Sequence, residues 1–118
     1  MNKLELVVKA LEKNFATDIV AIDMHLVSPL FDTFVVCSAG NARLMRALRE
    51  NTEDELEQAG IFAKNIEGNR DSQWILMDYD DIIIHIFSPD ERNNYHLEKL
   101  WGDQHQIDIS EYLNQNEL

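Results

Sequence analysis

The stretch QWILMDYDDIIIHIF, residues 73–87, predicts two β-strands with almost nothing between them, which is a tight hairpin. A two-residue turn needs a positive φ at its centre, and Asp tolerates this conformation better than most residues. We therefore expect the pair Tyr79-Asp80 to form the turn. The resulting register pairs Asp78 with Asp81, Leu76 with Ile83, and Trp74 with His85.

The predicted hairpin has two chemically different faces, because side chains alternate along a strand. One face is uniformly aliphatic and is the face that helices would cover: Ile75, Met77, Ile82, Ile84 and Ile86. The other face, called the mixed face below, combines aromatic, polar and aliphatic residues: Trp74, Leu76, Asp78, Asp81, Ile83, His85 and Phe87.

The mixed face allows two interpretations. Its carboxylates and its histidine would need partners if the face were buried, and its apolar part would form an interaction patch if the face were bare. The face is either a docking surface or is covered by the chain's own tail. We favour docking, because the predicted helices need to cover only one side of the sheet. The candidate docking residues on this face are Trp74, Leu76, Asp78, Asp81 and His85.

Helices and strands alternate along the rest of the chain. The first helix carries one apolar face, formed by Leu4, Val7, Val8, Leu11 and Phe15. A second helix is expected over residues 41–60, with Asn41 as its N-cap and Gly60 at its C-terminal end. Further strands are expected at residues 18–24, 31–38 and 61–68. We predict an α/β (α+β) fold, with a single mixed β-sheet of about five strands and helices packed on it.

A last helix is expected to begin at Pro89, with Ser88 as its cap. Further along it, Leu97, Leu100 and Trp101 form one stripe, which suits the core.

Tyr95 and Glu98 share another side of this helix and are candidates for contact with a partner. The ring of Trp101 can reach both sides, so we include it among the candidates. Residues 103–118 are mostly polar and are expected to form a C-terminal tail after a domain of residues 1–102.

The composition is that of one globular domain, because 118 residues are too few for two ordinary cores. A net charge of −12 would repel a phosphate backbone, so we expect no direct contact with nucleic acid. Acidity suits a basic protein partner, although it can also serve solubility alone.

No apolar run suggests a membrane span, and charges interrupt any signal-peptide core at the start, so we expect a cytoplasmic protein. The single Cys37 agrees with a reducing compartment, and we interpret it as buried filler.

No catalytic or metal-binding constellation emerges from the sequence. The four histidines, at 25, 85, 96 and 105, have no metal-ligand spacing. SAGN at 38–41 lacks the glycines and the lysine of a phosphate loop, and the hairpin turn explains the carboxylates at 78, 80 and 81 better than a metal site does. We expect no enzyme activity, no cofactor and no metal. An uncharacterised nucleotidyl transferase is the alternative.

The stretch SQWILMDYDDIIIHIFSPDERNNYHLEKLWGD, residues 72–103, resembles the signature of the Iojap-related ribosomal silencing factor family. That signature has a strand with a tryptophan, an Asp-Tyr-Gly-Asp turn, an aliphatic strand with one histidine, and a helix with Tyr-x-Leu-Glu-x-Leu-Trp. DIVAIDM and FDTFVVCSAG also resemble the first two strands of the family, and the likeness covers roughly residues 3–102. Asp80 stands where the family usually has glycine, and GNARLM replaces a Ser/Thr-rich opening of the middle helix.

The resemblance implies a fold related to nucleotidyl transferases, without known transferase activity. It implies binding to the large ribosomal subunit through ribosomal protein L-fourteen, which would sterically block joining of the small subunit and repress translation under nutrient limitation. It also implies that the protein forms homodimers. A role in assembly of the large subunit is an alternative that the sequence does not separate from silencing.

Overall fold

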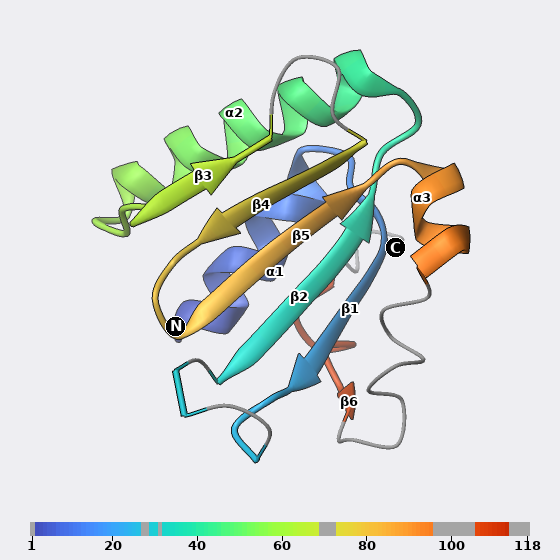
Figure 1. Ribbon diagram of the computed structural model, residues 1–118. Helices are drawn as coiled ribbons and strands as arrows, with labels where there is room; N and C mark the ends of the chain where they lie inside the picture. The colour runs from blue at the N-terminus through green and yellow to red at the C-terminus, as the bar shows by residue number, and fades with distance from the viewer. Residues whose placement is uncertain (1, 27–28, 31, 69–72, 96–105, 114–118) are drawn as a thin grey trace.

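The computed structural model describes residues 2–26, 29–30, 32–68, 73–95 and 106–113, and these form one sheet with three helices (Figure 1). The elements follow in the order α1 (Lys3–Lys13), β1 (Thr17–Asp23), β2 (Thr33–Ser38), α2 (Ala42–Gln58), β3 (Asn65–Glu67), β4 (Trp74–Asp78), β5 (Ile82–Phe87), α3 (Pro89–Tyr95) and β6 (Gln106–Ile107). The predicted order of helices and strands is confirmed from α1 to α3. None of the helices in this part of the chain is long and apolar enough to cross a bilayer.

The sheet is mixed, as predicted, but it has six strands in the order β3-β4-β5-β2-β1-β6. Strands β2 and β5 run parallel, and every other pair of neighbours is antiparallel. In Figure 1, α1 and α2 both lie behind the sheet, while the face towards the viewer carries neither of them. The two faces of the sheet are therefore packed differently, as the hairpin sequence predicts.

The predicted caps of the last two helices are confirmed. The side chain of Asn41 accepts a hydrogen bond from the backbone N–H of Leu44 at the start of α2, and Gly60 has φ +82° just after its end. Pro89 is the first residue of α3, and the hydroxyl of Ser88 accepts from the backbone N–H of Glu91. Both helices thus begin immediately after β2 and β5, the parallel pair at the centre of the sheet.

The end of α1 differs from the prediction at Phe15. The helix ends at Lys13, Phe15 has φ +75°, and its side chain is 85% exposed instead of lying on the apolar face. The backbone N–H of Ala16 bonds to the carbonyl of Leu11, and that of Phe15 bonds to the carbonyl of Glu12, which is the pattern of a Schellman cap. Once the chain turns there, helical spacing no longer fixes where the phenylalanine points.

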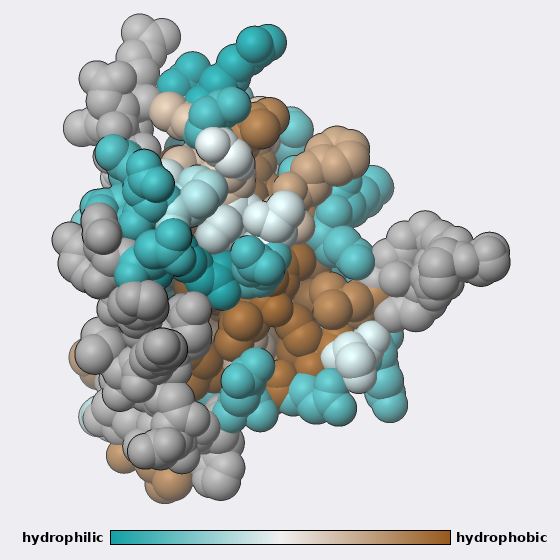
Figure 2. All heavy atoms as spheres, turned by 90° about the vertical axis from the view of Figure 1, so that its right-hand side faces the viewer, coloured by the Kyte–Doolittle hydropathy of each residue, from teal (hydrophilic) through white to brown (hydrophobic). Residues whose placement is uncertain are grey.

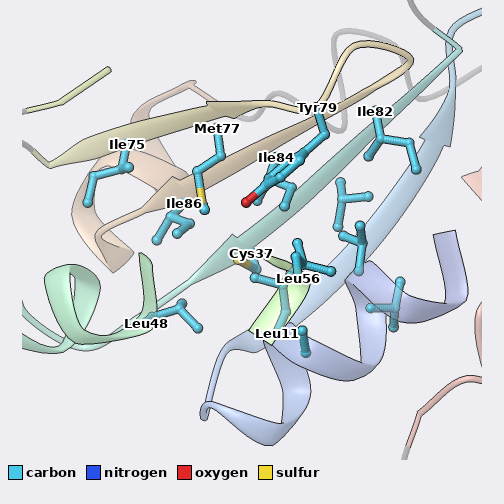
Figure 3. Close-up of a cluster of buried hydrophobic side chains, with 14 of the residues drawn as sticks. Leu11, Cys37, Leu48, Leu56, Ile75, Met77, Tyr79, Ile82, Ile84 and Ile86 are labelled. Carbon is cyan, nitrogen blue, oxygen red and sulfur yellow. The ribbon is translucent and has the colours of Figure 1, made fainter. Parts of the chain in front are cut away.

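The main core lies between the sheet and the two long helices. The aliphatic face of the hairpin is buried there as predicted, together with side chains of α1 and α2. Figure 3 shows side chains from the hairpin and from the two helices pointing into this core: Leu11, Leu48, Leu56, Ile75, Met77, Ile82, Ile84 and Ile86. Cys37 is fully buried in the same cluster, and burial raises the pKa of its thiol to about 12, so it is an inert core residue as expected.

The segment after residue 103 is not simply appended to the domain. Within its described part, β6 pairs with β1, and Ile109 is 6% exposed in the main core, with Tyr112 and Leu113 packed against it. Figure 2 shows this side of the molecule, where hydrophobic side chains gather around the β1–β6 edge and polar residues border them. The tail prediction is therefore wrong for residues 106–113, because the polar residues of this segment alternate with apolar ones that reach the core.

Candidate docking surface

The hairpin forms with a register two residues away from the predicted one. Asp78 pairs with Ile83, Leu76 with His85, and Trp74 with Phe87, and the turn is made by Asp80 and Asp81. Asp80 has the positive φ, +81°, and its N–H bonds to the carboxylate of Asp78 at 2.8 Å. A shift by two residues keeps every strand side chain on its predicted face, because the side-chain period of a strand is two.

Tyr79 explains why the register differs. Its ring is buried and points from the hairpin end into the core beside Ile84 (Figure 3), which a residue at the tip of the turn could not do. Its N–H bonds to the carbonyl of Ile82, so the ladder continues one pair further. The buried phenol has no hydrogen-bond partner within the described structure, and burial raises its pKa to about 12.

The mixed face is partly closed by a second, smaller core. Ile22, Met24, Phe34, Val36, Ile83 and Phe87 are buried there. The expectation of a bare surface is therefore wrong at His85 and Phe87, which are 4% and 1% exposed. The reason is aromatic packing that the sequence did not reveal: the His85 ring lies 4.5 Å from that of Phe34 and 5.7 Å from that of Trp74, between ring centroids.

What remains open on the mixed face is a groove with a volume of ≈410 Å³. Three predicted docking residues line it: Leu76, Asp78 and His85. The remaining lining side chains come from β2, β3, β5 and the adjoining loops: Leu30, Phe34, Lys64, Asn65, Glu67, Asp80 and Ile83. A smaller hollow of ≈210 Å³, lined by Glu67, Gly68, Trp74 and Leu76, adjoins it through their shared residues.

A hydrogen bond between Trp74 and His85 stabilises the floor of this surface. The indole Nε1–H donates to Nδ1 of His85 at 3.0 Å. Because Nδ1 accepts, the neutral ring carries its proton on Nε2, and that buried atom has no partner in the described part of the chain. Burial lowers the pKa of His85 to about 4, so the ring is neutral at physiological pH.

The rim of the groove is acidic. Glu67, Asp78 and Asp80 contribute carboxylates, and Lys64 contributes a cation that lies 3.5 Å from Asp80. Asn65 donates to the carboxylate of Glu67 at 2.9 Å and so orients it. The arrangement offers an apolar floor and negatively charged edges to whatever binds there.

Asp81, another predicted docking residue, does not line the groove. Asp81 is in the hairpin turn, and its carboxylate binds the Nζ of Lys3 in α1 at 2.6 Å, so it ties the hairpin to the helix layer. Tyr95 is the last residue of α3, while Glu98 and Trp101, with Leu97 and Leu100, lie outside the described residues. Their roles stay predictions.

Sequence reasoning missed the groove residues outside the hairpin. Phe34 sits in an unbroken buried strand, and Glu67 sits in a strand of three residues, so neither carried a distinguishing pattern. The one available signal was alternation in β3, which places Asn65 and Glu67 on the same side of the sheet.

The described residues show neither a metal cluster nor a favourable phosphate site. No three His, Cys, Asp or Glu side chains among the described residues come together in a way that could hold a metal ion. A depression of ≈360 Å³ lies where α2 and α3 begin and includes Gly40 and Asn41 of the SAGN turn. Its lining also includes Asp90, whose negative charge does not favour a phosphate there.

The fold and this surface define a class of small, acidic α/β protein with one helix-covered sheet face and one aromatic, carboxylate-rimmed face. Comparison with known proteins identifies the family to which the chain belongs. The family described as "Ribosomal silencing factor during starvation" matches residues 1–117 of the chain. The protein belongs to this family of ribosomal silencing factors.

Individual relatives agree with this assignment. The chain is similar to the ribosomal silencing factor RsfS of Bacillus subtilis (strain 168), with 35% identity over 112 residues and 95% of each sequence covered. It also resembles a solved structure from Chromobacterium violaceum, with a TM-score of 0.80, 27% identity, and 99% and 98% of the two chains covered. A relation of the fold to nucleotidyl transferases stays a prediction.

A more distant relative carries a different name. The mouse protein "Mitochondrial assembly of ribosomal large subunit protein 1" is 28% identical over 101 residues. The match covers 83% of this chain and 44% of that protein.

Proposed function

We propose that this protein silences ribosomes by binding the large subunit through the groove and the exposed part of the mixed face. The observation that carries the proposal is the combination of apolar floor and carboxylate rim on the sheet face that carries neither long helix. Such a mixture is typical of a surface that docks a protein, because the apolar part contributes binding energy and the charges select the partner.

The partner on the large subunit is ribosomal protein L-fourteen, as the family resemblance implies. A basic ribosomal protein complements both the rim carboxylates Glu67, Asp78 and Asp80 and the net charge of −12. The same charge disfavours direct contact with ribosomal RNA, because phosphates would be repelled.

The mechanism is steric and involves no catalysis. A protein bound at the site where the small subunit docks prevents the two subunits from joining, and translation falls as a result. The polar groups on the docking surface therefore recognise the partner and perform no chemical step. A homodimer, which the resemblance also implies, stays a prediction.

The test is sedimentation of purified, mature ribosomal subunits with increasing amounts of the protein. We expect the peak of joined ribosomes to fall as free subunits accumulate, with the protein in the large-subunit fraction. An undiminished peak of joined ribosomes at saturating protein would contradict silencing.

The second candidate function, assembly of the large subunit, is favoured by the name of the mouse relative. The same gradients distinguish the two functions. An assembly factor would associate with immature large subunits and leave the joining of mature subunits unaffected, whereas a silencing factor acts on mature subunits.

A further inference from the structure

The hollow beside Trp74 combines an aromatic ring with a carboxylate. Glu67 pairs with Leu76 across β3 and β4, so Trp74 is the diagonal neighbour of Glu67 on the same face. Backbone positions related in this way are about 7–8 Å apart, which leaves room for a flat group between the two side chains.

The indole of Trp74 is held in a fixed orientation. Its N–H is occupied by His85, and its ring is stacked on that of Phe87 at 5.1 Å between centroids, with 27° between the planes. The side chain is still 38% exposed. Because its N–H already donates to His85, the ring offers π-electrons rather than a hydrogen-bond donor to a ligand.

The opposite wall of the hollow is equally defined. The hydrogen bond from Asn65 holds one carboxylate oxygen of Glu67 and leaves the other available. Gly68 has φ +120°, and a Cβ at this position would lie 3.0 Å from the carbonyl oxygen of Trp74. Glycine thus allows the end of β3 to lie against Trp74 without a side chain filling the space.

We infer that this hollow is a subsite for an arginine side chain of the basic partner, with the guanidinium over the Trp74 indole and paired with the Glu67 carboxylate. Tryptophan is the best π-partner for a cation, and a planar guanidinium both stacks on aromatic rings and matches a carboxylate fork. The acidic rim favours a cation over an apolar side chain. The inference rests on the proposed function, because it assigns one contact within the proposed docking surface.

The first experiment replaces the Trp74 indole, by site-specific incorporation, with tryptophans carrying one, two and three fluorines. Each fluorine withdraws electron density from the ring and weakens its attraction for a cation. We expect affinity for large ribosomal subunits to fall stepwise, by about 3- to 30-fold in total, as for a cation–π contact. Constant or rising affinity would overturn the inference, since it would show an apolar contact only.

A matched pair of variants tests the carboxylate. Glu67→Gln removes one negative charge at the hollow and keeps an oxygen for Asn65, whereas Glu111→Gln removes one exposed charge on the C-terminal segment. Affinity should fall about 3-fold or more for the first variant and stay near the wild-type value for the second. Equal effects would mean that net charge, and no specific subsite, is responsible.

A third experiment needs no ribosome and therefore separates this inference from the proposed function. The protein is titrated with N-acetyl-arginine methylamide and with its uncharged analogue, N-acetyl-citrulline methylamide, while the indole N–H signals are followed by NMR. The arginine compound should shift the Trp74 signal saturably, with a smaller shift in the Glu67→Gln variant, and the citrulline compound should not. Identical responses to both compounds would exclude the subsite. A selective arginine response without ribosome binding would retain the subsite and contradict the proposed function.

Discussion

Asp80 occupies a backbone conformation that glycine adopts at lower cost. Its φ of +81° lies in the left-handed region, where a Cβ is unfavourable although Asp tolerates it. Its ion pair with Lys64 joins two exposed side chains and contributes little stability. Asp80→Gly should therefore raise the free energy of unfolding by about 0.5–1 kcal/mol, measured by urea denaturation.

Asp80→Asn is the control for this substitution, because it removes the same charge but keeps a residue that tolerates positive φ. We expect its stability to stay close to that of the wild type. If the glycine variant were no more stable than the asparagine variant, the strain assigned to this turn would be absent.

His85 makes the stability of the protein depend on pH. Its pKa is about 4 in the folded state, against 6.5 when unperturbed. Between these values the unfolded chain binds a proton that the folded protein does not, so stability is lost as pH falls from 6.5 towards 4, by about 3 kcal/mol at most. Below the folded pKa both states are protonated and the loss stops growing.

The measurement is the free energy of unfolding at several pH values between 7 and 4 for wild type and His85→Gln. The His85 variant should lose less stability on acidification, whatever its stability at pH 7. Parallel curves for the two proteins would show that His85 is not buried in its neutral form.

Residue identity predicted some local features and not others. Asn41, Ser88 and Pro89 were predictable as helix starts, because capping depends on the residue and its immediate neighbours. The positive φ of Phe15 was not predictable, because it depends on where α1 ends. The burial of His85 was not predictable either, because it depends on Phe34, an aromatic neighbour 51 positions away. For His85 the missing information was therefore long-range packing, and for Phe15 it was the residue at which the helix ends.

At the scale of elements, the hairpin shows why face assignments can be correct when pairing is not. Alternation assigned the aliphatic residues to the core, and it is unaffected by a register error of two. The choice of turn depended on Tyr79, whose burial in the core outweighed the short-range turn preference. The groove itself required β3 and the loop before β2, whose positions beside the hairpin no local pattern indicated.

The C-terminal segment provides a prediction for a single element. Strand β6 has two residues, too few for any periodicity, yet it brings Ile109 into the main core. Ile109→Ala should lower the free energy of unfolding by about 2–5 kcal/mol, because it removes buried methyl groups. Leu26→Ala, at an exposed position, should change it by less than about 0.5 kcal/mol. Equal and small effects in chemical denaturation would mean that the segment is only an appended tail.

Over the whole molecule, the charge of −12 should speed the encounter with a basic partner. We expect the association rate with large ribosomal subunits to fall as salt rises from low to physiological strength, while the dissociation rate changes less. Stopped-flow mixing of fluorescently labelled protein with subunits measures both rates. An association rate that is insensitive to salt would count against electrostatic steering.

We expect the mixed face to be a surface through which the protein binds the large ribosomal subunit. The measurement is the affinity of Trp74→Ala and Phe15→Ala for purified large subunits, with thermal melting to establish that both variants are folded. Both substitutions remove an exposed aromatic ring, but only Trp74 lies on the mixed face. We expect a loss of about 30-fold or more in affinity for Trp74→Ala and wild-type affinity for Phe15→Ala. Wild-type affinity of a folded Trp74→Ala variant would contradict this expectation.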